Sequence, residues 1–69
     1  MHGRVTAFDD PRGLGEVTAD DGTTYPFHCT AIADGTRTIA EGATVHFEVV
    51  AGRMGRWEAA RLASAPSIV

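Results

Sequence analysis

The side chains that most often bind metals or act as nucleophiles are few and scattered in this sequence. The candidates are His2, His28, Cys29 and His46. None of them has the Cys-x-x-Cys or His-x-x-x-His spacing that brings ligands to one zinc ion, so the sequence predicts no metal site. Cys29 directly follows His28, and neighbours along a strand point to opposite faces, which argues against a Cys–His nucleophile.

The other potentially reactive residues have structural explanations. Ser64 and Ser67 lie near the C-terminus, where no base is placed to activate them. The aspartates at 9–10 and 20–21 fall in expected turns, where Asp is favoured for backbone reasons. The glycines at 13 and 15 precede no predicted helix, so they do not form a phosphate cradle. The sequence therefore predicts a protein that is not an enzyme and needs no cofactor.

Length and charge restrict the class of protein. A chain of 69 residues forms one domain, and a domain of this size buries only about 60% of the surface that it exposes when unfolded. With one cysteine no internal disulfide can form, and no leader or membrane-spanning run is visible, so a soluble cytoplasmic domain without membrane contact is expected. Nine acidic residues against six arginines argue mildly against a polyanionic partner, unless acids and arginines occupy opposite faces.

Five short segments have the alternation of strands, and turn signals separate them. We expect strands at residues 2–8, 15–19, 24–29, 44–51 and 56–62. Asp10-Pro11-Arg12-Gly13 fits a type I turn, Asp21-Gly22 fits a tight hairpin, and residues 30–33 fit a short helical turn. Because no long helix is predicted, the pattern favours a small antiparallel barrel, which leaves few open edges.

The predicted core consists of the apolar side chains that alternation places on the inner face of the strands. Ala60 is expected to point inward with Leu62, and Pro26 is expected at a sheet edge because it lacks an amide donor. We place the domain at residues 1–62 and a poorly ordered tail at 63–69. The predicted core comprises Val5, Val17, Tyr25, Phe27, Ile32, Val45, Phe47, Val49 and Leu62.

The order and spacing of these features resemble the bacterial cold-shock proteins. The resemblance covers residues 3–62 and implies an all-β fold, a small five-stranded antiparallel OB-fold barrel of cold-shock type. It includes two motifs of ribonucleoprotein type, at residues 12–17 and 25–32. It rests on Gly3-Arg4-Val5, Phe8, Arg12-Gly13-Leu14-Gly15, His28 followed by Thr30-Ala31-Ile32, Arg37-Thr38-Ile39 with Glu41-Gly42, Val45-His46-Phe47-Glu48-Val49, and Ala59-Ala60.

The resemblance implies binding of single-stranded RNA or DNA. In that family aromatic rings stack on unpaired bases while basic side chains follow the phosphates. Here Arg4, Phe8, Arg12 and His28 match the family pattern. Most of the stacking aromatics are replaced, by Ala7, Leu14, Glu16, Pro26 and Cys29 and by a residue near Thr36.

These replacements lower the expected affinity. Loss of about five stacking positions, at ~1–3 kcal/mol each, removes most of the binding free energy of such a surface. Glu16 adds a charge that repels phosphates. Trp57, which stands where the family usually has a proline, partly compensates if it lies at the rim of this face beside Arg56 and Arg53.

Two functional hypotheses follow. The first is weak, low-specificity binding of single-stranded nucleic acid by Arg4, Phe8, Arg12, Leu14, His28, Arg56 and Trp57. The second is a barrel that has lost this activity and contacts a protein partner, or a second copy of itself, through Leu14, Glu16, Pro26 and Cys29. Individual residues also have purely structural interpretations, in which Trp57 covers the barrel end, Phe8 belongs to the core and His28 is an ordinary exposed strand residue.

Overall fold

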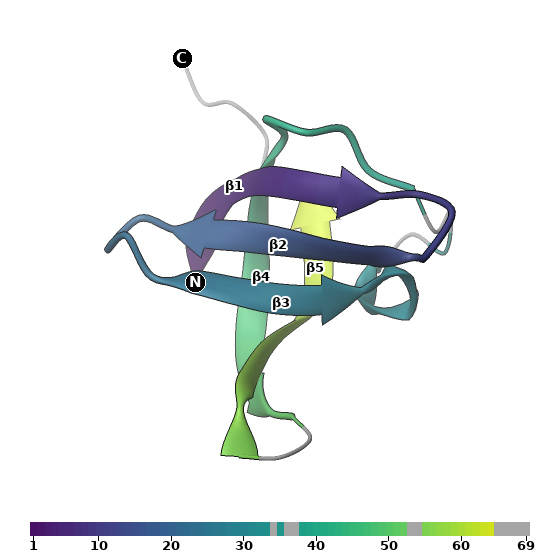
Figure 1. Cartoon of the computed structure of the whole chain (residues 1–69). Helices are drawn as coiled ribbons and strands as arrows, with labels where there is room; N and C mark the ends of the chain where they lie inside the picture. The colour runs from purple at the N-terminus through teal and green to yellow at the C-terminus, as the bar shows by residue number, and fades with distance from the viewer. Residues whose placement is uncertain (34, 36–37, 53–54, 65–69) are drawn as a thin grey trace.

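Five antiparallel strands form one continuous sheet in the computed structural model, which describes residues 1–33, 35, 38–52 and 55–64. The strands are β1 (His2–Asp9), β2 (Leu14–Ala19), β3 (Thr24–His28), β4 (Thr44–Ala51) and β5 (Trp57–Ser64), and a short 3-10 helix, η1 (Cys29–Ala31), follows β3. Their order in the sheet is β3-β2-β1-β4-β5. In Figure 1, β1, β2 and β3 lie across the view, and β4 and β5 cross behind them at a steep angle.

The sheet closes on itself between its two outer strands. β1 pairs with β2 along its length but with β4 only through His2, Gly3 and Arg4, so the sheet bends sharply at this end of β1. On the opposite side Ile32 forms a parallel bridge with Leu62. The Ala33 amide also donates to the Leu62 carbonyl at 2.8 Å. The predicted five-stranded antiparallel OB-fold barrel is therefore confirmed.

One apolar core fills the barrel. Of the predicted core residues, all but Tyr25 and Val49 are buried; these two are half-buried and pack against the others. Ala19 and Ala59 are also buried, although their small side chains gave no hydrophobic signal in the sequence. The buried residues are Val5, Val17, Ala19, Phe27, Ile32, Val45, Phe47, Ala59 and Leu62.

A bulge in β5 changes which of its residues face the core. His46 pairs with Ala63 and Glu48 with Ala60, so β5 has one extra residue in this interval. Arg61 lies there with a φ of 54°. The prediction that Ala60 and Leu62 point inward together is therefore wrong for Ala60, because the extra residue makes Ala59 and Leu62 the buried pair.

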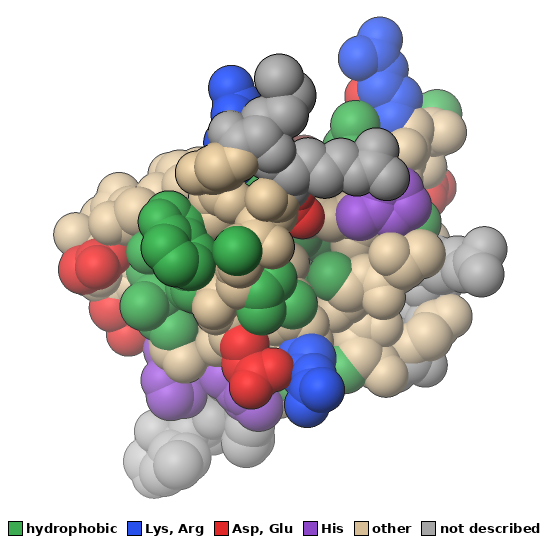
Figure 2. Space-filling view, turned by 90° about the horizontal axis from the view of Figure 1, so that it is seen from below, with side chains coloured by type: hydrophobic (Ala, Val, Ile, Leu, Met, Phe, Trp, Pro, Cys, Tyr) green, Lys and Arg blue, Asp and Glu red, His purple; other side chains and the backbone are tan. Residues whose placement is uncertain are grey.

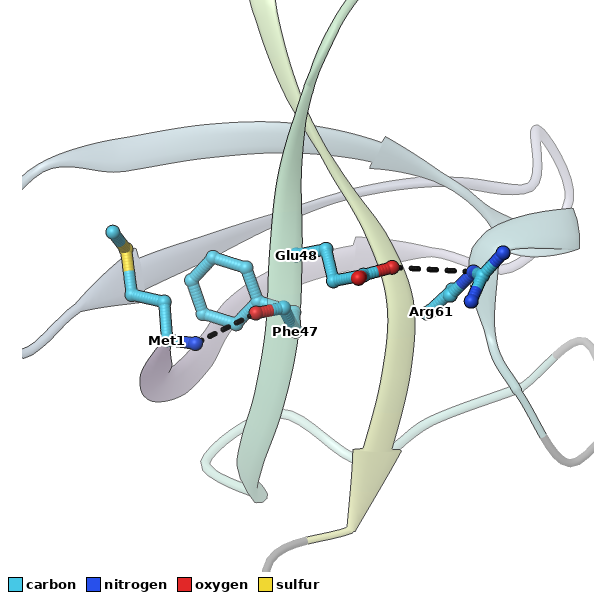
Figure 3. Close-up of polar contacts among 4 residues, drawn as sticks. All are labelled: Met1, Phe47, Glu48 and Arg61. Carbon is cyan, nitrogen blue, oxygen red and sulfur yellow. Dashed lines mark hydrogen bonds and ion pairs between the residues drawn. The ribbon is translucent and has the colours of Figure 1, made fainter.

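One ion pair and two hydrogen bonds tie β4 to its surroundings, and Figure 3 shows the residues that make them. The exposed Arg61 guanidinium pairs with the Glu48 carboxylate at 3.1 Å, directly at the bulge. The Met1 amino group donates to the Phe47 carbonyl at 2.8 Å, and the Phe47 amide donates to the Met1 carbonyl at 2.7 Å. The two hydrogen bonds between Met1 and Phe47 extend the short β1–β4 pairing by one residue.

Several element ends differ from the sequence prediction. β4 has the predicted bounds, but β3 ends one residue earlier because Cys29 begins η1, which the prediction placed at 30–33. β5 runs to Ser64, which pairs with Val45, while residues 65–69 of the predicted tail lie outside the described residues. No helix in the described part of the chain has the length and apolar character that crossing a membrane requires.

The hairpin between β2 and β3 has the geometry that its sequence predicts. Gly22 has a φ of 90°, and its amide donates to the Ala19 carbonyl at 2.9 Å. The Asp21 carboxylate accepts from the Thr23 amide at 2.9 Å. This hydrogen bond favours the charged form and lowers the pKa of Asp21 below its ordinary value of 3.8.

Candidate functional site

The outer face of β2 and β3 carries the positions at which the sequence predicts binding. Leu14 lies opposite His28, and Glu16 lies opposite Pro26, so the four side chains form two adjacent cross-strand pairs. Leu14, Glu16 and His28 are exposed, whereas Pro26 is half-buried. Two of the predicted binding residues, Leu14 and His28, are therefore neighbours.

Two glycines let the chain reach this face. Gly13 has a φ of 66°, and a side chain there would approach the Cys29 sulfur to 2.8 Å. At Gly15 a Cβ atom would lie 2.5 Å from Cζ of Phe27 and 2.8 Å from the Ala7 carbonyl oxygen. Glycine at position 15 thus allows the Phe27 ring to pack directly against the backbone of β2.

Phe8 lies between the core and the surface. Its ring is parallel to that of Phe27, with an interplanar angle of 8° and a centroid distance of 6.0 Å. The side chain is half-buried and packs against the core. Phe8 therefore stabilises the barrel wall and presents only part of its ring to solvent.

His28 and Cys29 are closer than the sequence predicts. The argument that they point to opposite faces of one strand is wrong, because Cys29 belongs to η1, and its sulfur lies 3.8 Å from Nδ1 of His28. That nitrogen also accepts from the Thr30 amide at 3.3 Å, so His28 acts as the N-cap of η1. The same nitrogen lies 3.0 Å from the Thr30 hydroxyl oxygen, so Nδ1 is shared by the Thr30 amide, the Thr30 hydroxyl and the Cys29 thiol.

Two hollows lie where the end of the β4–β5 hairpin approaches β2 and β3. The first, which we call the His28 depression, has a volume of about 760 Å³. The second, the Trp57 groove, has a volume of about 430 Å³. The His28 depression is lined by Leu14, Phe27, His28, Ala51, Gly52 and Glu58, and the Trp57 groove by Glu16, Thr23, Thr24, Tyr25, Pro26, Gly55, Arg56 and Trp57.

Trp57 and Arg56 are brought together in the Trp57 groove. The Trp57 side chain is 61% exposed and therefore does not cover the barrel end as a buried plug. The groove also contains Glu16 and Pro26 from the second pair on the outer face. Trp57 is thus placed beside the predicted binding face, and His28 lines the other hollow.

The basic side chains of the described residues do not form one patch. Arg12 pairs with Asp9 at 3.5 Å in the β1–β2 turn, and Arg4 lies opposite Thr18 at the other end of β1. Figure 2 shows hydrophobic side chains gathered in one area of the viewed face with acidic side chains nearby, whereas the basic side chains lie at separate places. Arg37, Arg53 and Thr36 lie outside the described residues.

Sequence reasoning missed a row of hydroxyl groups next to the predicted site. Thr6 and Thr18 are hydrogen-bonded through their side-chain oxygens at 3.2 Å, and Thr18 and Thr24 at 3.0 Å. Alternation places Thr18 and Thr24 beside Glu16 and Pro26, and it places Thr6 on the same side of β1 as Arg4, the partner of Thr18. Thr6 is the extra residue of a bulge in β1 between Val5 and Ala7. No feature of the sequence predicts this bulge.

The described residues offer no metal-binding cluster of three or more His, Cys, Asp or Glu side chains. The rings of His2 and His46 lie 5.9 Å apart, since the two residues are partners between β1 and β4. Two imidazoles without a third ligand do not form a structural zinc site.

Comparison with known proteins gives a consistent result. Residues 1–64 match the family model described as the 'Cold-shock' DNA-binding domain. A cold shock-like protein of Thermotoga maritima is 39% identical over 56 residues, which cover 80% of this chain and 85% of that protein. Cold shock-like protein CspE of Escherichia coli K12 is 40% identical over 57 residues, covering 80% and 83%. Glycine-rich protein 2 of Nicotiana sylvestris is 46% identical over 59 residues, covering 83% of this chain and 28% of that protein.

Proposed function

This chain belongs to the cold-shock domain family, whose members are nucleic-acid-binding, non-enzymatic proteins, and on that premise we propose that it binds single-stranded RNA or DNA weakly and with little sequence preference. The proposed surface is the outer face of β2 and β3 together with the Trp57 groove. Bases stack on Trp57 and His28, and Arg56 contacts a phosphate.

The observation that carries this proposal is the exposed Trp57 ring beside Arg56 in one groove. An exposed indole stacks on any base, and stacking contributes ~1–3 kcal/mol per base. An adjacent guanidinium supplies the charge that a phosphate needs. The groove adjoins the outer face of β2 and β3, on which the family resemblance places the bound strand, and this position supports the proposal.

The binding is weak because the surrounding face offers little else. Leu14, Glu16 and Pro26 stand at stacking positions without a ring. Arg12 is already paired with Asp9. A surface with one exposed indole and few free cations supports few base and phosphate contacts, and contacts of this kind discriminate little between sequences.

The test is a titration of short single strands followed by tryptophan fluorescence at low salt. Trp57 is the only tryptophan, so quenching reports directly on the groove. We expect saturable quenching by both DNA and RNA strands. A labelled strand should bind more weakly to Trp57→Leu than to the parent protein. Val50→Ala is the control, because Val50 is exposed but lines neither hollow, and it should bind the labelled strand like the parent. Absence of quenching at high micromolar strand concentration would contradict the proposal.

Leu14 favours the alternative, in which the same face contacts a protein or a second copy of the chain. Its side chain is 49% exposed although it is large and apolar. Cys29, however, lies in η1 with its sulfur beside Gly13 and not on β3. The alternative predicts concentration-dependent sedimentation that Leu14→Asp abolishes; a monomer at every concentration would exclude self-association.

A further inference from the structure

We propose that the Trp57 groove is a guanine subsite, in which Glu16 accepts hydrogen bonds from the Watson–Crick edge of one unpaired guanine stacked on Trp57. The proposal rests on the proposed function and adds one selective position to a strand that is otherwise bound with little preference. Glu16, which repels phosphates, would thereby favour one particular base.

The groove combines three side chains that make no polar contact with one another. In the described part of the chain, no ion pair or side-chain hydrogen bond engages the Glu16 carboxylate, and only its backbone carbonyl accepts, from the Thr6 hydroxyl at 3.4 Å. Arg56 and Glu16 line the same groove but form no ion pair with each other there. A free acceptor, a free cation and an exposed ring thus share one site.

The size of the groove suits a nucleobase. Its volume of about 430 Å³ lies within the ~300–1,000 Å³ typical of small-molecule sites. Trp57 comes from the start of β5, and Glu16 comes from β2 opposite Pro26. Ring and carboxylate therefore stand on different strands around one hollow, as needed for one to stack on a base and the other to meet its edge.

The chemistry of the bases selects guanine. A carboxylate accepts hydrogen bonds but donates none, and its two oxygens accept side by side. Guanine presents two neighbouring donors on its Watson–Crick edge, N1–H and the N2 amino group. Adenine and cytosine each present one amino group beside an unprotonated ring nitrogen, and thymine and uracil present one N–H between two carbonyl groups. Those acceptors face the carboxylate unfavourably, so only guanine fits it with both contacts.

The experiment compares hexathymidylate strands in which one internal base is replaced by guanine, adenine, cytosine or hypoxanthine. Hypoxanthine retains N1–H but lacks the N2 amino group, so it isolates the second contact. We expect the guanine strand to bind about fivefold to tenfold more tightly than the others, near the lower end of the discrimination that a bidentate base contact provides. The hypoxanthine strand should lose most of this preference.

Two variants with the same change in charge separate base recognition from repulsion. Glu16→Gln should abolish the preference for guanine, whereas Asp10→Asn, in the exposed turn after β1 and outside both hollows, should preserve it. Equal binding of all strands by the parent protein would overturn the guanine subsite while leaving the proposed function intact. The subsite is also overturned if Glu16→Gln strengthens the binding of every strand equally, so that the ratio of the affinity for the guanine strand to that for the other strands is unchanged. Absence of binding by any strand would instead overturn the proposed function.

Discussion

Glu16 is the residue that most distinguishes this face from a simple stacking surface. It lies exposed in the middle of β2, opposite Pro26 and next to the exposed Trp57 ring. A carboxylate at this position weakens contact with nearby phosphates, because like charges repel. It also opposes stacking of a base above it, because the carboxylate loses bound water when a base covers it. On the proposed guanine subsite, its effect on a bound strand would depend on which base lies over it.

Replacing Glu16 by an aromatic residue should strengthen binding to strands without guanine. Glu16→Phe adds a stacking ring and removes a negative charge, so we expect oligothymidylate to bind more tightly by ~1–3 kcal/mol. Fluorescence titration at low salt measures the change, with Glu16→Gln as the control that removes only the charge. If Glu16→Phe leaves the affinity unchanged, the outer face of β2 and β3 is not the binding face.

At the scale of elements, the alternation of side chains was reliable where strands are regular and failed where they bulge. β4 alternates cleanly, and Val45 and Phe47 are buried as predicted. In β5 the sequence Ala59-Ala60-Arg61 has little hydrophobic contrast. The bulge at Arg61 changes which residues before it face the core. Sequence alternation assumes one residue per pleat, so it cannot locate an extra residue.

The same limit applies to the candidate site, where the sequence predicts what regular strands determine but not what depends on irregular or tertiary structure. Glu16 and Pro26 fall within predicted strands, so their place on one face could be inferred, whereas Leu14 lay just before the predicted strand and pairs with His28 only because β2 begins one residue earlier. The position of Cys29 could not, because it depends on the His28 ring capping η1. The two hollows also depend on where the β4–β5 hairpin lies relative to β3, a tertiary relation that no local pattern specifies.

The bulge itself gives a stability prediction for β5. Arg61 has a φ of 54°, a region that glycine tolerates and β-branched residues avoid. Arg61→Val should lower the free energy of unfolding by about 1–2 kcal/mol, whereas Arg61→Gly should remain within about 1 kcal/mol of the parent. Denaturant unfolding measures both, and Glu48→Gln isolates the exposed ion pair with Arg61. Equal losses for Val and Gly would show that the backbone at this position is not strained.

For the whole molecule, the distribution of charge limits how strongly a strand can be held. The formal net charge is −3. Among the arginines of the described part, Arg12 and Arg61 already pair with carboxylates, which leaves Arg4 and Arg56 for phosphates. On the proposed function, binding would therefore depend on stacking more than on charge, and the long-range attraction for a polyanion would be small.

The salt dependence of binding should therefore be shallow. Each neutralised phosphate of a single strand contributes a slope of about −0.7 to the dependence of log K on log salt concentration, so one or two contacts predict a slope between about −0.7 and −1.4. Arg56→Gln should reduce the slope by about one contact, whereas Arg61→Gln, whose parent guanidinium pairs with Glu48, should not. A slope near zero for the parent would contradict phosphate contact by Arg56.

The bridge between Ile32 and Leu62 joins segments that are far apart in the chain, and the Ala33 amide is bonded to Leu62 directly beside it. Loops that long close at an entropic cost, so this seam should be among the last parts of the sheet to form and the first to separate. Deuterium can replace the Ala33 amide proton only when its hydrogen bond to the Leu62 carbonyl is broken. The exchange rate of that single proton therefore reports the fraction of time for which this contact of the seam is open.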